Sequence, residues 1–287
     1  MTKMFLALIF LLALVAAPNA ETLAPGQEVK LTYKAYWGGF VVSEISSTVY
    51  VGPSDYHMEV SYEVTGLAAI FNKMKNKVSA RGMISPDGTL RPLVYENEGS
   101  WGAEHGYKNR TEFNPDDSKI ISHDYDFKFK KEYSYIPIKD ALKFGPDMVS
   151  FYLGLTLDKT AIKLGPDFKH QNVFGGFFLL DIAYRCLDHK QQTSRRSLYQ
   201  GDVLACEFND KIIAGDFKKT TGKKKKKKRK RKKKNRSDLE PVPVHIWYAH
   251  MAGVDAMVPV YSEFDVTWGK VRVYLTDMDV IAQRSAP

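Results

Sequence analysis

Apolar residues occur at every second position in many segments of this chain, and this period constrains the fold more than any other feature. In residues 29–37 the odd positions are Val, Leu, Tyr, Ala and Trp, and polar residues such as Lys30 lie between them. Because successive side chains of a β-strand point to opposite faces, the pattern predicts a strand with one buried face. We expect Trp37 to pack inward with Leu31 and Tyr33, so that Trp37→Ala costs about 3 to 5 kcal/mol.

Turn residues divide the chain into further segments of this kind. Gly38 and Gly39, for example, end the first strand and begin a turn. Two other segments, residues 67–74 and 147–157, have apolar residues at helical spacing and predict short helices. Strands are expected over residues 29–37, 40–51, 56–64, 77–84, 89–98, 107–113, 119–126, 177–187, 198–208, 245–250, 257–267 and 270–275.

These elements predict an all-β fold of mainly antiparallel strands. We expect a curled sheet, or an open β-barrel or spiral, because curling manages the exposed edges of a large sheet. We also expect one or two short helices, and one of them would pack into the concave face of the sheet. Residues 21–287 are long enough for a single β-rich domain with a sizeable core. The 16 Tyr and 16 Phe either fill that core or line a hydrophobic groove, and filling the core is the more ordinary role.

Residues 1–20 predict a secretory signal peptide. Lys3 precedes an apolar run from Phe5 to Ala17, which is shorter than the roughly 20 residues that cross a bilayer. We expect cleavage near Ala20 and a periplasmic protein. A retained N-terminal anchor is the alternative, which the short run disfavours.

The chain contains 2 cysteines, Cys186 and Cys206. They lie on consecutive expected strands, and pairing them opposite each other places Tyr184 opposite Phe208 on the same face. In an oxidising compartment an even number of cysteines favours a disulfide. Closing this loop would stabilise the fold by about 3 kcal/mol. The alternative is two buried, reduced thiols.

A run of Lys and Arg from residue 223 to 234, here called the basic tract, dominates the charge. The formal net charge is +9, but without this tract 30 bases face 33 acids. Like charges repel at helical spacing, so residues 218–238 are expected to form a disordered loop inserted in the domain.

The expected partner of the basic tract is anionic phospholipid or lipopolysaccharide, and the alternative is a solvated insertion without a partner. Nucleic acid is disfavoured by the export signal. The binding residues would be Lys223, Lys224, Lys225, Lys226, Lys227, Lys228, Arg229, Lys230, Arg231, Lys232, Lys233 and Lys234.

No recognisable catalytic or metal-binding set occurs in the sequence. It has no GxSxG motif, and its 7 histidines include no HExxH motif. His123, Asp124 and Asp126 form the one acidic and imidazole cluster, which is more typical of a solvated strand face than of a metal site. Glu96 and Glu98 share a strand face, a spacing that arises often by chance. We therefore expect no catalytic residues, no metal and no cofactor.

Five segments form a characteristic series. They are LTYKAYWGGFVVSE (31–44), GPDMVSFYLGL (145–155), LYQGDVLACEF (198–208), HIWYA (245–249) and PVYSEFDVTWGKVRVYL (259–275). In this order and spacing, the chain resembles the exported bacterial proteins of the domain of unknown function 3108 family. The resemblance covers nearly the whole mature chain and implies an exported, β-rich envelope protein with no established reaction. The basic tract departs from the family pattern as an insertion in a variable loop.

Two functions fit these observations. The first is a non-enzymatic envelope protein that binds a peptide, a lipid or another hydrophobic ligand, or a cell-wall component, or that scaffolds envelope partners. The second is a hydrolase or transferase that acts on an envelope polymer through an unrecognised site. Copurified lipid or peptide would favour the first. Turnover of envelope material, lost on mutation of one polar residue, would favour the second.

Overall fold

The computed structural model describes residues 26–71, 73–102, 105–128, 133–158, 160–219, 242–251, 256–267 and 269–281. The expected signal peptide and the basic tract lie outside these ranges. The strands are β1 (Gln27–Trp37), β2 (Phe40–Val51), β3 (Asp55–Val64), β4 (Met74–Ile84), β5 (Leu90–Trp101), β6 (His105–Phe113), β7 (Ile120–Lys128), β8 (Tyr133–Ile136), β9 (Lys169–Phe174), β10 (Leu179–Gln192), β11 (Gly201–Ala214), β12 (Asp216–Lys219), β13 (Val244–His250), β14 (Met257–Val266) and β15 (Gly269–Ile281).

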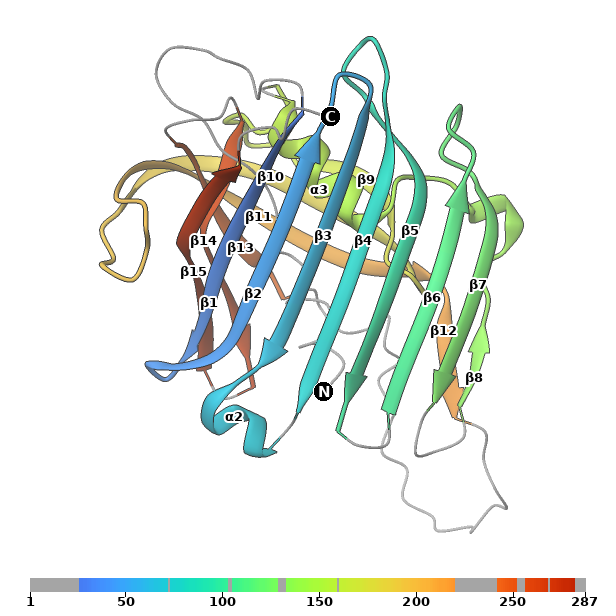
Figure 1. Ribbon diagram of the computed structural model, residues 1–287, viewed down its shortest axis with the longest axis horizontal. Coiled ribbons are helices and arrows are strands. Elements are labelled where there is room, and N and C mark those ends of the chain that lie inside the picture. Colours follow the sequence, from blue (N-terminus) through green and yellow to red (C-terminus); the bar gives the residue numbers. More distant parts are fainter. Residues whose placement is uncertain are drawn as a thin grey trace.

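The fold is all-β and antiparallel, as the sequence predicts. Within the described ranges, thirteen strands form one sheet in the order β7-β6-β5-β4-β3-β2-β1-β15-β14-β13-β11-β10-β9. The sheet curls, so that β1 to β7 form the front layer in Figure 1 and the strands from β9 onward pass behind them. The strands β8, β9 and β12 were not expected from the sequence.

Aromatic side chains fill much of the interior. The largest fully buried ones include Tyr33, Tyr56, Tyr95, Tyr152, Tyr248, Phe174 and Phe208.

The first strand shows how the period of two produces this core. Val29, Leu31, Tyr33 and Ala35 are all buried, as the alternation predicts. The expectation that Trp37 also packs inward is wrong, because its side chain is 37% exposed. Trp37 is the last residue of β1 and pairs with Phe40 beside the turn, after a register shift in the β1–β2 pairing. The alternation of apolar residues along β1 therefore extends one position beyond the side chains that are buried. Because Trp37 is partly exposed, the loss of about 3 to 5 kcal/mol expected for Trp37→Ala does not apply.

Both expected helices are present. α2 (Gly66–Phe71) connects β3 to β4, and α3 (Met148–Leu157) lies inside the curl, where it contacts β4, β5, β9 and β14. Figure 1 shows α3 between the front strands and those behind. A helix that is apolar on all sides is typical of a buried position, and most α3 residues are buried. A short 3-10 helix, η2 (Asp140–Leu142), precedes α3.

The two edge strands of the sheet, β7 and β9, are connected by the segment that leads into α3. The carbonyl of Lys143 accepts a hydrogen bond from the Ile120 amide at 3.0 Å, on the β7 side. The carbonyl of Pro146 accepts one from the Phe174 amide at 2.9 Å, on the β9 side. Residues 143–146 thus bridge the gap between the two edge strands by one backbone hydrogen bond to each side.

A second connection, here called the clasp, is the antiparallel pair β8 and β12. β8 follows the edge strand β7, and β12 follows β11, which is third from the opposite edge of the sheet, so their pairing connects the two sides of the curl. The clasp lies at the lower right of Figure 1. Lys218 and Lys219 belong to β12, so the expectation that a disordered loop begins at residue 218 is wrong at its first two residues. Backbone pairing with β8 orders them, a long-range contact that a local charge pattern does not reveal.

Candidate functional site

The expected disulfide between Cys186 and Cys206 is confirmed. The two cysteines face each other across β10 and β11, in a register that also pairs Tyr184 with Phe208. The rings of Tyr184 and Phe208 are stacked, with centroids 5.6 Å apart. Each cysteine is 2% exposed, so the disulfide is a buried structural bond, of a kind typical of proteins that fold in oxidising compartments.

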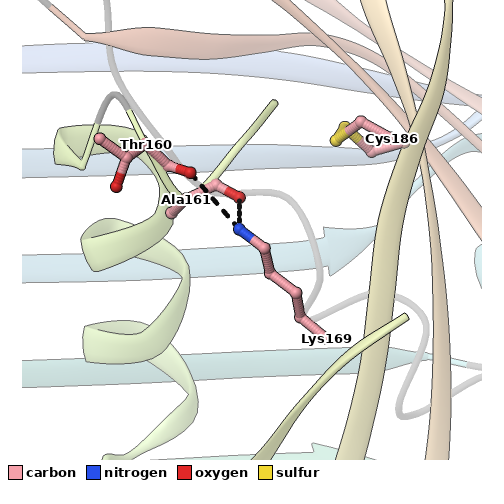
Figure 2. The surroundings of a disulfide bond; sticks show 5 residues. Thr160, Ala161, Lys169 and Cys186 are labelled. Atoms are coloured by element: carbon pink, nitrogen blue, oxygen red, sulfur yellow. Dashed lines mark hydrogen bonds between the residues drawn. A yellow bond between two sulfur atoms is a disulfide. The ribbon is translucent and has the colours of Figure 1, made fainter. Parts of the chain in front are cut away.

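The loop before β9 covers the disulfide. The amide of Gly165 donates to the carbonyl of Cys186 at 2.9 Å. The Lys169 ammonium group donates to the carbonyl of Ala161 at 2.9 Å and to that of Thr160 at 3.4 Å, and Figure 2 shows these three residues beside Cys186. The Gly165 bond attaches the loop to β10 at Cys186, and the Lys169 bonds attach it to the first residue of β9.

The N-terminus of α3 carries a hydrogen-bonded group of three polar side chains. Asp147 caps the helix by accepting from the Ser150 amide at 2.9 Å. Its other oxygen accepts from the Ser150 hydroxyl at 2.5 Å, and that hydroxyl lies 2.6 Å from the Tyr56 hydroxyl. A carboxylate beside two hydroxyls resembles a nucleophilic site, but each of the three residues is at most 1% exposed. Its position is that of a buried cap that ties α3 to β3.

The pKa of Asp147 makes this cap sensitive to pH. Burial raises the pKa from 3.8 to about 6, although hydrogen bonds from Ser150 partly oppose the rise. Because the folded pKa lies above the unfolded one, the neutral carboxyl favours folding, and this stabilisation is lost as the pH rises from about 4 to above 6. By linkage the loss amounts to about 3 kcal/mol.

We therefore expect Asp147→Asn to gain stability relative to the native protein as the pH rises from about 4 to about 7, by up to about 3 kcal/mol. Asn still accepts from the Ser150 amide but does not ionise. Urea unfolding of both proteins across this pH range measures the difference. A difference in unfolding free energy that stays constant with pH would contradict the assignment.

A row of buried amides crosses the inner face of β4, β5 and β6. The Asn76 side chain donates to the Asn97 side-chain oxygen at 2.7 Å and contacts the Tyr107 hydroxyl at 2.6 Å. Asn109 lies opposite Asn97 in the strand register. The turn between β9 and β10 covers the row: a Cβ added to Gly176 would lie 3.0 Å from Asn109 and 3.1 Å from Asn97. Each of the three amide side chains belongs to a residue that is at most 4% exposed, so packing encloses most of the row.

His123 lies in an aromatic cluster and apart from its two acidic neighbours in the sequence. Its ring contacts Tyr125 and Phe174, with centroids 5.1 and 5.3 Å away. Burial lowers the pKa of His123 to about 4, although a hydrogen bond with the Gly176 backbone opposes the shift. Asp124 and Asp126 are both exposed at the surface. Among the described residues, no group of three His, Cys, Asp or Glu side chains is placed to hold a metal ion.

A hollow of about 770 Å³ is lined mostly by residues of β2 to β6, among them the charged Glu63, Lys75 and Glu98. Near it, Glu96 pairs with Arg110 at 2.8 Å, and Glu98 lies 3.9 Å from Lys108. The two glutamates singled out in the sequence thus take part in cross-strand ion pairs. The carboxylates and ammonium groups that line the hollow belong to exposed residues. Such a surface can offer hydrogen bonds and charge to a polar ligand.

The residues expected to bind an anionic surface, 223–234, lie outside the described residues, but the chain on either side of them is described. Before the tract, β12 ends at Lys219, which pairs with Tyr133 of β8. After it, the chain is described again from residue 242, and β13 begins at Val244. The tract therefore connects the clasp to a strand of the main sheet.

Comparisons with known proteins do not show a family for this chain. No family model matches the chain, and no curated protein matches it. A solved β-barrel-like protein of the domain of unknown function 1849, from Brucella abortus, is similar with 6% identity and a TM-score of 0.48, over 92% of this chain and 100% of that one. A proposed lipoprotein from Parabacteroides distasonis is similar with 12% identity and a TM-score of 0.30, over 90% of this chain and 97% of that one. The resemblance to the domain of unknown function 3108 family stays a prediction.

Proposed function

We propose that this chain is an exported, non-enzymatic protein of the bacterial cell envelope that is held at an anionic surface by its basic tract. The buried disulfide between Cys186 and Cys206 supports export, because such bonds persist in oxidising compartments. The polar group around Asp147 is sealed inside the core, where a substrate would not reach it. Among the described residues, no helix is long and apolar enough to cross a membrane.

The observation that carries the proposal is the distribution of charge. Outside the basic tract, 30 bases face 33 acids, so the positive charge of the protein is concentrated in residues 223–234. A base near an anionic membrane contributes about 1 kcal/mol within a Debye length of about 8 Å. If about four bases engage at once, the binding free energy is about 4 kcal/mol, which corresponds to a dissociation constant of about 1 mM. Such binding is measurable and depends strongly on salt.

Deleting residues 223–234 is expected to abolish sedimentation with vesicles that contain phosphatidylglycerol, at low salt. The thermal stability should change little, because the length of a surface loop contributes only weakly to the closure entropy. A matched variant in which the tract is replaced by Ser and Gly of equal length separates the charge from the loop length. Failure of the intact protein to sediment, or equal sedimentation at about 0.5 M salt, would show that the attachment is not electrostatic.

A further inference from the structure

The turn between β1 and β2 presents three apolar side chains to solvent. Trp37 is 37% exposed, Phe40 is 65% exposed and Val41 is 37% exposed. We call residues 37–41 the tip. Apolar groups gathered at one protruding turn are typical of an interaction site, whereas single exposed apolar residues are ordinary.

The backbone of the tip makes it a protruding turn. Gly38 and Gly39 have positive φ values of 57° and 91°, which suit a tight two-residue hairpin turn. A Cβ built on either glycine meets no atom within 4 Å. The tip therefore projects into open space, and Figure 1 shows it at the lower left, at the same end of the sheet as α2.

A positive charge lies beside the tip. The guanidinium group of Arg196 is 4.5 Å from the centre of the Tyr36 ring and donates to the carbonyl of Gly39 at 3.5 Å. Arg196 comes from the loop between β10 and β11, which thus reaches the β1–β2 turn, and its neighbour Arg195 is exposed as well. The apolar tip therefore has one basic side chain, that of Arg196, at its base.

The described residues on either side of the basic tract, Lys219 and Val244, belong to strands that meet the rim of the sheet that carries the tip. On one side, Val244 pairs with Phe264, Phe264 with Val271, and Val271 with Trp37, so β13 begins three strands from the tip on one line of register. At the strand spacing of about 4.8 Å, this separation is about 14 Å.

On the other side, the tract leaves from the clasp. Lys219 pairs with Tyr133, which begins the strand after β7. The end of β7, Lys128, lies opposite Gly106 near the start of β6, on the rim where β1 ends and β2 begins. Figure 1 shows the β1–β2 turn, α2 and the clasp along the lower side of the molecule.

We propose that the tip inserts into the interface of an anionic phospholipid bilayer when the basic tract binds that surface. This inference rests on the proposed function and adds the apolar contact to it. Trp and Phe are suited to the boundary between headgroups and acyl chains, and Arg and Lys beside them pair with anionic headgroups. The tip and the tract then engage one surface from the same rim, the charges providing attraction and the Phe40 ring an apolar contact that salt does not screen.

The test compares two exposed residues in the full mature protein. Phe40→Ser removes the apolar group of the tip, and Ile121→Ser is the matched control, because Ile121 is 64% exposed and lies beside the turn between β6 and β7, at the opposite end of the strands. With vesicles of equal parts phosphatidylglycerol and phosphatidylcholine, Phe40→Ser is expected to weaken partitioning at least about tenfold. Ile121→Ser should partition like the native protein. Thermal melting of both variants checks that they fold.

A second measurement places the tip in the bilayer directly. Vesicles with brominated acyl chains should quench part of the tryptophan fluorescence of the native protein, and this part should disappear in Trp37→Phe. Equal partitioning of Phe40→Ser and the native protein, with no such quenching, overturns the insertion of the tip and leaves the role of the tract intact. If Phe40→Ser loses binding while the protein without the tract retains it, the tip is supported and the role of the tract is wrong. Failure of the native protein to bind overturns both.

Discussion

Replacing Phe174 by Ala is expected to lower the free energy of unfolding by about 3 to 5 kcal/mol, the range typical of a buried Phe. Phe174 is the last residue of β9 and is fully buried. Its ring contacts those of Tyr95, Phe113 and His123, with centroid distances of 6.0, 6.1 and 5.3 Å. These three residues belong to β5, β6 and β7, at the other end of the strand order, so the Phe174 ring joins the two ends of the curled sheet.

Urea unfolding at constant pH measures this effect. Phe40→Ala is the matched control, because the same change is made at a ring that is 65% exposed, and we expect a loss of stability well under about 1 kcal/mol there. If Phe174→Ala costs no more than Phe40→Ala, contacts between the two ends of the sheet contribute little to stability, and the curl is held by its neighbouring strand pairs alone.

Replacing both cysteines by Ala is expected to lower the free energy of unfolding by about 3 kcal/mol. Cys186 and Cys206 are separated by 20 positions in the sequence, and opening this loop raises the conformational entropy of the unfolded chain. The native structure should change little, because β10 and β11 pair along most of their length on both sides of the bond.

Denaturant unfolding of the native and double-variant proteins tests this expectation. The native protein unfolded in the presence of a reductant is the control, and it should unfold at nearly the same denaturant concentration as the double variant. Mass analysis after alkylation without reduction should find no labelled thiols in the native protein. Two labelled thiols, or a double variant as stable as the oxidised protein, would contradict the predicted contribution of the disulfide.

Local patterns in the sequence were sufficient for much of the fold. The period of two predicted the buried face of β1 from Val29 to Ala35, and the helical spacing after Asp147 predicted α3. The register of β10 and β11 followed from the two cysteines, because placing them opposite each other also aligned the apolar residues of both strands. In each case neighbouring residues carry the information, since the direction of a side chain in a strand or a helix is set by its position along the chain.

Patterns failed where the element was short or polar. β8 and β12 have four residues each, too few for a period to be recognised, and the first four residues of β9 are exposed. Trp37 continues the apolar alternation of its strand, yet it lies beyond the covering layer. A period states which face a side chain is on, but it does not state how far the opposing layer extends.

Local sequence patterns predicted the class of the fold, the pairing of the two cysteines and the helix α3, and they located the net positive charge in one tract. The folded chain alone shows which distant residues meet: the hydroxyls of Tyr56 and Ser150, 94 positions apart, and the ring of Phe174 with rings of β5, β6 and β7. It also places the strands that flank the tract, β12 and β13, at the rim that carries the apolar tip. The reason is that such contacts depend on the direction and degree of the curl of the whole sheet, which arises from the twist of many strand pairs together.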